Sequence, residues 1–237
     1  MTQCYSLTGV GCGWYDQVRA KRSTKLFRSQ KCVRAANRES HRSNSDARLV
    51  TTELGTVGMT LADDIRACTR CPLHLECSSP VPAEVGSNYH EGGLAVLTET
   101  PGLSSKAQAF LDAMLTAAGT SRDQMVVLST VRCRPADNRL DKHPEALFAC
   151  NDWLVAELEA YNPKVVVLLG NTPMRKVYGQ QAKITAVRGL PRQTGPAFQY
   201  GAHCFVPTFN PTYGLRNSAA QAVILDDLKL AVELCSN

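Results

Sequence analysis

The sequence predicts a three-layer α/β/α fold around a central, mostly parallel sheet of four strands. Four short apolar runs are rich in Val and Leu without alternation, as in strands that are buried on both faces. Segments with helical spacing of apolar residues separate these runs. Polar loops follow three of the strands, at the edge where open α/β sheets bind ligands. The predicted strands are 93–97, 125–129, 164–169 and 203–207.

Helices are predicted before, between and after these strands. Residues 107–118 (AQAFLDAMLTAA) have helical spacing and end at Gly119, a residue type that is common just after a helix. Further helices are expected at 60–69, 144–161, 172–177 and 218–235. The helix at 144–161 is expected to carry Cys150 in its interior.

The first 58 residues differ in composition from the rest of the chain. They have little apolar periodicity, and much of the basic excess lies between Arg19 and Arg48. Because this composition cannot bury a core, we expect residues 1–58 to form a disordered or loosely ordered extension, or a basic arm on nucleic acid. The folded domain is predicted to span residues 59–237.

Charge and hydropathy narrow the class of protein. The net charge of +5 is compatible with a polyanionic partner but does not require one. The sequence has no run of 18 apolar residues and no signal-peptide pattern at its start. We therefore expect a cytoplasmic monomer with no membrane association and no obligate protein partner.

Ten cysteines are many for a reducing compartment, where metal ligation is more common than disulfide bonding. Cys68 and Cys71 form a C-x-x-C pair, and Cys133 and Cys150 follow singly. Four thiolates can hold a [4Fe–4S] cluster or a zinc ion, and free thiols remain an alternative. The single short pair favours the cluster, in which Cys77 could replace one ligand. The others are taken as ordinary thiols: Cys4, Cys12, Cys32, Cys204 and Cys235.

The order of several short motifs over residues 60–235 resembles the iron–sulfur uracil-DNA glycosylases of families 4 and 5. These motifs are CTRCPL, TETPG, CRPADNR, PKVVVLLGNTP, ITAVRG and VPTFNP followed by LRN. The resemblance implies a monofunctional DNA glycosylase that hydrolyses the N-glycosidic bond of a flipped pyrimidine and leaves an abasic site. It also implies a structural [4Fe–4S] cluster with these ligands: Cys68, Cys71, Cys133 and Cys150.

The loop after the first predicted strand carries a candidate catalytic carboxylate. A glycosylase must stabilise an oxocarbenium-like sugar and place a water molecule, and a carboxylate serves both needs. Glu99 matches the acidic position of the family's first motif. A lone loop glutamate is usually just solvated, but this one follows a buried strand within a Pro–Gly turn. The same motif implies substrate contacts for its neighbours Thr98, Pro101 and Gly102.

The family's second motif usually begins with His-Pro, and here it begins with Asn210 and Pro211. An amide can donate a hydrogen bond to a base carbonyl, although it cannot be a cation. The resemblance implies that this loop, with Tyr213, enters the minor groove. Arg216 is expected to contact a phosphate, and the alternative is a solvated arginine at a helix start.

Two departures from the family concern the identity of the base. Ser129 stands where family 4 has an asparagine that reads uracil, and Thr130 is an alternative reader. The family's Pro-Phe-Val-Gly stretch, with its stacking Phe, is missing after Gly102, and Phe110 is expected in the core. A flipped base is read by hydrogen bonds and stacking. The pocket is therefore expected to accept uracil or a bulkier modified pyrimidine, such as a hypermodified base of viral DNA in an antiviral setting.

Two functions of other classes remain open. A catalytically silent protein of the same fold could bind damaged or modified DNA, which the lost Asn and His favour and the retained Glu99 disfavours. A cluster-bearing interaction module for redox sensing has less support, because the sequence has no evident electron-transfer feature.

Overall fold

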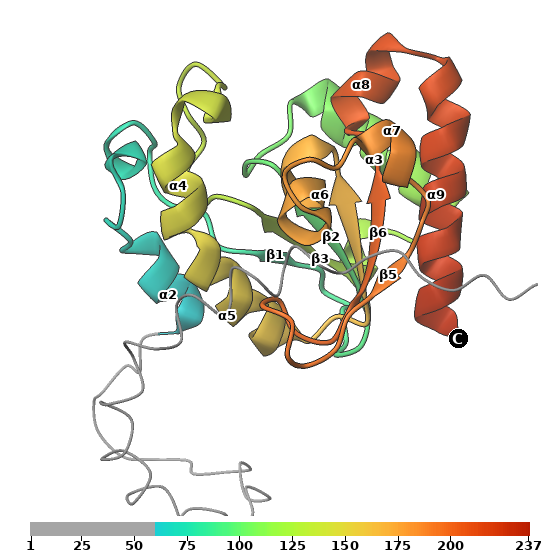
Figure 1. Ribbon diagram of the computed structural model, residues 1–237, viewed down its shortest axis with the longest axis horizontal. Coiled ribbons are helices and arrows are strands. Elements are labelled where there is room, and N and C mark those ends of the chain that lie inside the picture. The colour runs from blue at the N-terminus through green and yellow to red at the C-terminus, as the bar shows by residue number, and fades with distance from the viewer. Residues whose placement is uncertain (1–59) are drawn as a thin grey trace, which may run out of the picture. The chain divides into compact units, whose positions relative to one another are not determined.

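The computed structural model describes residues 60–237, so the extension predicted for residues 1–58 lies outside the described residues. This part of the chain is an α/β domain in which helices cover both faces of one sheet (Figure 1). Within it, no helix is long and apolar enough to span a membrane.

The sheet has six strands in the order β1-β3-β2-β4-β6-β5. Its four central strands run parallel, which confirms the predicted core. The two short edge strands pair antiparallel and were not predicted, because two residues carry no periodic signal. The strands are β1 (Glu84–Val85), β2 (Leu94–Thr98), β3 (Met125–Ser129), β4 (Val165–Leu169), β5 (Arg192–Gln193) and β6 (Cys204–Thr208).

Two helical layers enclose the central strands. The α-helices are α2 (Leu61–Arg66), α3 (Ser105–Ala117), α4 (Pro144–Ala149), α5 (Asn151–Tyr161), α6 (Asn171–Tyr178), α7 (Ile184–Val187), α8 (Pro211–Arg216) and α9 (Ala219–Ser236). Residues 60–237 also contain three short 3₁₀ helices: η1 (Pro72–Leu75), η2 (Arg122–Gln124) and η3 (Leu140–Lys142). Helices α3, α8 and α9 lie on one side of the sheet, and α4, α5 and α6 lie on the other (Figure 1).

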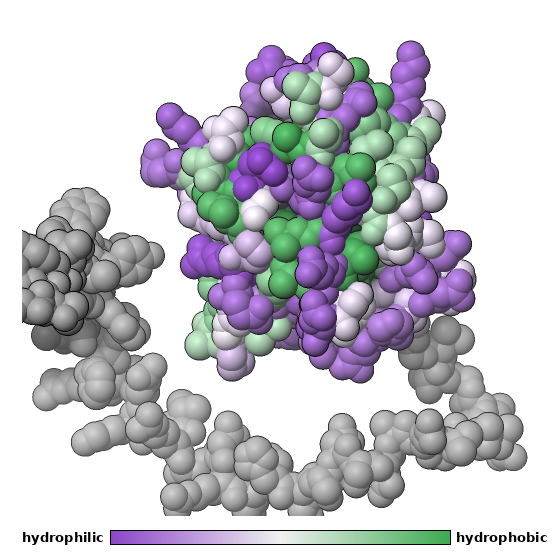
Figure 2. Space-filling model, turned by 90° about the vertical axis from the view of Figure 1, so that its right-hand side faces the viewer, coloured by the Kyte–Doolittle hydropathy of each residue, from purple (hydrophilic) through white to green (hydrophobic). Residues whose placement is uncertain are grey.

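Alternate residues of each central strand face opposite layers. Leu94 and Val96 of β2 pack in the core that includes residues of α3 and α9, whereas Ala95 and Leu97 pack in the core that includes residues of α5 and α6. Each fully buried Leu or Val side chain contributes about 1.5–3 kcal/mol. Continuous apolar strands are therefore required here. Figure 2 shows the side that carries α9, where apolar residues lie among polar ones, as on an outer layer exposed to water.

The helix predicted over 144–161 is two helices, α4 and α5, and Cys150 lies between them rather than inside one. The backbone of Cys150 has φ −84° and ψ −3°, away from ideal helical values. Its Sγ accepts a hydrogen bond from the backbone N–H of Arg132, 3.4 Å away. This tertiary contact, which no helical pattern records, accompanies the break.

The ITAVRG motif holds the carboxyl end of β6 to α9. Asp227 of α9 is buried and accepts hydrogen bonds from Arg188 and from the Thr208 hydroxyl, the latter at 2.7 Å. Gly189 has φ +66°, and a Cβ there would lie 2.5 Å from Asp227 Oδ1. The glycine is therefore required both by its backbone angle and by the close carboxylate. These contacts position the strand end from which the second motif departs.

Candidate active site and cysteine centre

The loops that follow β2 and β3 are tied together at the carboxyl edge of the sheet. The backbone N–H of Thr130 donates to Thr98 O at 2.9 Å, and the Thr130 hydroxyl donates to the carbonyl of Glu99. Thr130 is fully buried. Thr130 therefore fixes the backbone of Glu99. This structural role differs from the recognition of the base that the sequence suggested for Thr130.

Glu99 faces the layer that contains α6. Together with Thr172, Lys176 and Tyr200, it lines a cavity of about 470 Å³. Burial raises the pKa of the Glu99 carboxyl group, and the hydroxyl of Thr172 opposes that shift. A half-buried carboxylate whose pKa is raised by its surroundings is typical of a site that handles protons.

Asn210 is the N-cap of α8. Its Oδ1 accepts a hydrogen bond from Thr212 N at 2.9 Å, which satisfies one of the free N–H groups at the helix start. Because the carbonyl oxygen is engaged there, the side-chain NH₂ group remains as the donor for a ligand. Gly170 lies against this side chain: it has φ +94°, and a Cβ there would be 3.1 Å from Asn210 Cβ.

The start of α6 brings the two candidate catalytic residues to one region. Gly170, the N-cap of α6, contacts Asn210, and Thr172 in the first turn interacts with Glu99. The backbone N–H of Gly170 also donates to Thr208 O at 2.9 Å, which joins the ends of β4 and β6. A carboxylate and an amide donor therefore flank the same helix start.

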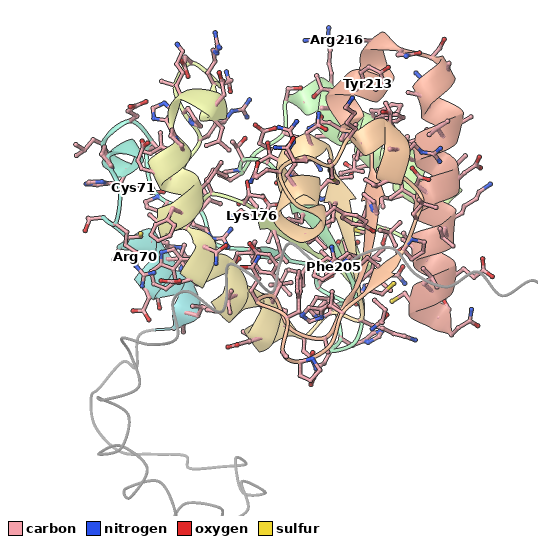
Figure 3. The ribbon with its side chains drawn as sticks, in the orientation of Figure 1. Arg70, Cys71, Lys176, Phe205, Tyr213 and Arg216 are labelled. Carbon is pink, nitrogen blue, oxygen red and sulfur yellow. The ribbon has the colours of Figure 1, made fainter. Side chains whose placement is uncertain are left out.

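Helix α8 presents a mixed apolar and cationic surface. Pro211 is buried at its first position, while Tyr213 and Arg216 are exposed (Figure 3). Tyr213 packs against Phe209 with ring centroids 5.0 Å apart. Leu215 is also exposed. It was not predicted as a site residue, although an apolar residue beside polar ones at the end of the motif indicated an exposed leucine.

Ser129 does not line the cavity of Glu99. Together with Thr98, Pro101 and Gly102, it lines a separate cavity of about 30 Å³. Pro101 and Gly102 also border a groove of about 540 Å³ that reaches Cys77 and Arg134. The Arg134 guanidinium donates a hydrogen bond to Gly102 O, which fixes the loop between the cavities. The structure therefore divides the predicted pocket residues between two cavities.

Three of the four cysteines predicted as ligands lie in or against one apolar cluster, although they come from distant parts of the chain. Cys133 and Cys150 are buried in it beside Leu73 and Leu140, and Cys71 packs against it. Cys77 packs there as well, and its thiol contacts that of Cys133. Figure 3 shows Cys71 beside the α2–α4 region, away from α8.

The fourth predicted ligand, Cys68, contacts Trp153 of α5, the helix that begins directly after Cys150. Trp153 Nε1 donates a hydrogen bond to Cys68 Sγ at 3.1 Å, and the Arg70 guanidinium lies 3.9 Å from the centroid of the Trp153 ring. Hydrogen bonds from N–H groups to sulfur are typical around thiolate ligands of iron–sulfur clusters. Among residues 60–237, no three Cys, His, Asp or Glu side chains group closely enough to hold a single metal ion.

Comparison with known proteins identifies the family. The family model described as "Uracil DNA glycosylase superfamily" matches residues 86–229. A type-4 uracil-DNA glycosylase of Thermotoga maritima is 32% identical over 183 residues, which cover 72% of this chain and 91% of that protein. A type-4 enzyme of Archaeoglobus fulgidus is 34% identical over 116 residues, or 45% of this chain and 56% of that protein.

A third relative extends over a comparable length. The type-4 uracil-DNA glycosylase of Saccharolobus solfataricus is 26% identical over 191 residues, which cover 75% of this chain and 86% of that protein. The residues matched by the family model include the loops after β2 and β6, the start of α6, and Cys133 and Cys150. On the strength of a family match over more than half of its length, this chain belongs to the uracil DNA glycosylase superfamily.

Proposed function

We propose that this protein is a monofunctional DNA glycosylase that removes uracil from DNA by hydrolysing the N-glycosidic bond. The observation that carries the proposal is the pairing of a half-buried carboxylate, Glu99, with the amide donor of Asn210 at the start of α6. The relatives, named type-4 uracil-DNA glycosylases, support uracil as the base.

Glu99 acts on the water and the sugar, and Asn210 acts on the leaving base. The water oxygen forms a bond to C1′ while the bond from C1′ to the base nitrogen breaks, and the base leaves with the electron pair. The Glu99 carboxylate orients the water, accepts its proton and stabilises the positive charge on the sugar. The Asn210 NH₂ group donates to a base carbonyl, where the negative charge of the leaving base collects.

DNA contact is assigned to α8. Arg216 binds a backbone phosphate, and Tyr213 and Leu215 present apolar surface to the minor groove beside the flipped nucleotide. A phosphate contact by arginine releases counterions, so it contributes to the salt dependence of binding.

The donor set of the cysteine centre fits a [4Fe–4S] cluster. The thiols proposed as ligands are Cys68, Cys71, Cys133 and Cys150. When bound, the cluster supplies four iron–thiolate bonds, which join α2, η1, the loop after β3 and the junction between α4 and α5. The backbone N–H of Arg132 and the indole N–H of Trp153 serve as donors to two of these sulfurs.

A second candidate substrate is a 5-substituted or glycosylated pyrimidine, such as a base of hypermodified viral DNA. The observation that favours it is the groove of about 540 Å³ that adjoins the Ser129 cavity along Pro101 and Gly102. The cavity of about 30 Å³ at Ser129 itself offers little room for a bulky group. Uracil is therefore the primary proposal.

The test is side-by-side incubation with duplexes that contain uracil, 5-hydroxymethyl or glucosylated pyrimidines, followed by alkali and mass spectrometry of the released bases. Release of uracil supports the primary proposal, and selective release of a bulky base supports the second. Binding of DNA without release of any base would contradict both and would favour a silent DNA-binding protein.

Thr172 is expected to control the pH dependence of the reaction. The Glu99 carboxylate acts in its ionised form, which is present above its pKa, and Thr172 lowers that pKa. Replacing Thr172 with Val removes the hydroxyl with little change in shape, so the pKa rises further. The acidic limb of the rate profile then moves to higher pH while the rate at alkaline pH is retained. Single-turnover rates across pH measure this, and an unmoved acidic limb would contradict it.

We also propose that residues 59–237 form the folded domain. Deleting residues 1–58 is expected to leave a folded protein that retains iron and cooperative thermal unfolding, because residues 60–237 supply the sheet, its covering helices and the cores described above. If the deleted segment is a basic arm, the truncated protein also shows a weaker salt dependence of DNA binding. Circular dichroism and iron content test the boundary, and loss of folding would show that it is wrong.

A further inference from the structure

The cavity of about 470 Å³ beside Glu99 continues along α6 from its first turn to its end. Its lining includes Thr172 in the first turn, Arg175 and Lys176 in the second, and Gly179 after the last residue of the helix. Thr172 and Lys176 are four residues apart, so they lie on one face of the helix. Because Thr172 interacts with Glu99, the two basic residues lie about one turn beyond the reacting end of the cavity.

The ammonium group of Lys176 is held in place at this cavity. Its Nζ donates to Leu147 O at 2.9 Å and to Asn151 Oδ1 at 3.2 Å, so Lys176 reaches from α6 toward α4 and α5 (Figure 3). The Tyr200 hydroxyl donates to the same Asn151 oxygen at 2.7 Å. An ammonium group has three N–H donors, and the described residues accept two of them. The third N–H is therefore available to a ligand.

The positive charge in the second turn of α6 has no carboxylate partner within the described part of the chain. Among residues 60–237, neither Arg175 nor Lys176 forms an ion pair. Asp141, which lines the cavity near Glu99, is paired instead with Arg139, whose Nη2 lies 2.8 Å from Asp141 Oδ2. Burial lowers the pKa of Lys176, because a half-buried cation is costly without a counter-ion. A bound anion offsets that cost.

We propose that Arg175 and Lys176 form a subsite for one phosphate of the DNA backbone, next to the reacting sugar at Glu99. This inference rests on the proposed glycosylase function, which makes DNA the ligand. A phosphodiester carries one negative charge, and its oxygens only accept hydrogen bonds. Ammonium and guanidinium groups only donate them, so the two side chains match a phosphate in both charge and hydrogen bonding. An uncharged base offers no such match to two cations.

The length of the cavity indicates which phosphate is bound. Thr172, next to Glu99, and Lys176 are about 6 Å apart along the helix axis, and phosphates of one strand follow each other at about 3.4 Å of duplex axis. The bound phosphate is therefore the first or second from the flipped nucleotide. Figure 3 shows Arg216 on α8 well away from Lys176, so Arg216 is expected to hold a different phosphate.

The first test measures binding of the full chain to duplexes in which one phosphate near uracil is replaced by an uncharged methylphosphonate. Four duplexes place it at the first or second linkage on either side of the uridine, which carries a 2′-fluorine to slow cleavage during the measurement. At one or more linkages the replacement is expected to raise the Kd of the unmodified protein by about tenfold, because a charge-assisted hydrogen bond is lost. Arg175→Gln should raise the Kd of the all-phosphate duplex by a similar factor.

Combining the protein change with the DNA change identifies the contact. At the linkage that Arg175 binds, the methylphosphonate should cost Arg175→Gln no further affinity. The exposed Lys229 of α9, on the other side of the sheet, is the matched control for the loss of one positive charge, and Lys229→Gln should keep the full penalty. The slope of log Kd against log salt should also fall by about 0.9 in Arg175→Gln and stay unchanged in Lys229→Gln.

Lys176 is tested with two substitutions of similar length. Lys176→Met removes the charge and should reduce the penalty at the same linkage, whereas Lys176→Arg keeps the charge and should retain most of it. A residue that only joined α6 to α4 and α5 would not change the penalty at one particular linkage. If Lys176→Met does not fold, as judged by circular dichroism and iron content, the exposed Arg175 still decides the question through Arg175→Gln.

The outcomes separate the phosphate subsite from the proposed function. Equal methylphosphonate penalties at all four linkages in the unmodified protein and in Arg175→Gln overturn the subsite. Absence of uracil release from an ordinary duplex overturns the proposed function, even where the coupling between Arg175 and one linkage is found. Uracil release without that coupling overturns the subsite alone.

Discussion

Replacing Cys133 with Ser is expected to remove the bound iron and the visible colour of the protein and to unfold the region around α2, α4 and η1. Cys133 is 4% exposed and packs with Leu73 and Cys150. The binding free energy of a structural metal site is on the order of 10 kcal/mol, whereas a whole domain is stable by about 5–15 kcal/mol. Loss of one ligand in four therefore removes a large share of the stability.

Two other cysteines provide controls for this experiment. Cys204 is buried in β6 away from the centre, and Cys204→Ser should retain iron. Cys77 contacts Cys133, and Cys77→Ser should also retain iron, because the proposed ligand set is complete without it. Iron and zinc analysis with visible spectra distinguishes the results. Full iron content in Cys133→Ser contradicts the assignment, and its loss in Cys77→Ser makes Cys77 a ligand.

The parallel core was predictable because strands that are buried on both faces have continuous apolar sequences. The run at 125–129 coincides with β3, since every residue of that strand is buried or nearly so and the run ends where polar loop residues begin. The break between α4 and α5 was not predictable. Helical spacing continues across Cys150, and only the contact from Arg132 N–H distinguishes that position.

The sequence indicated which residues lie at the edge of the sheet, but it did not show that they line two different cavities. Glu99 directly follows β2 and Ser129 is the last residue of β3, and because both strands end at the same edge of the sheet, the sequence suggested one pocket. Side-chain direction separates them, because Ser129 is the last residue of β3 and faces one cavity, while Glu99 lies beyond β2 and turns toward α6.

The buried ion pair of Arg132 and Glu157 was missed, although the sequence contained a signal for it. Glu157 occupies an apolar position of α5, three residues after Leu154 and one before Leu158, both of which are buried. A charged residue at a core position needs a partner of opposite sign, and Arg132 lies three residues after the end of the buried strand β3. The CRP triplet was interpreted only through Cys133 as a cluster ligand, and Arg132, which precedes it, had no predicted role.

Glu99→Gln is expected to lower the single-turnover rate of base release by about 100-fold or more, while DNA binding persists. The substitution keeps the shape of the side chain and removes its charge and its ability to accept a proton, and a general base typically contributes about 10²–10⁴-fold. Binding should persist because the proposed DNA contacts lie on α8 and in the second turn of α6. The exposed Glu159 of α5 is the matched control, and Glu159→Gln should keep the full rate.

The pH dependence of the rate tests the role of Glu99 in a way that does not depend on the absolute rate. Burial raises the pKa of Glu99, so the unmodified protein should lose activity, as pH falls, at a higher pH than an exposed glutamate would dictate. In Glu99→Gln no carboxyl group titrates at this position, and the remaining slow reaction should show no such acidic limb. An acidic limb that survives in Glu99→Gln would assign the titration to another group. An unchanged rate at all pH values would remove Glu99 from the reaction and leave Asn210 as the only proposed catalytic side chain at the start of α6.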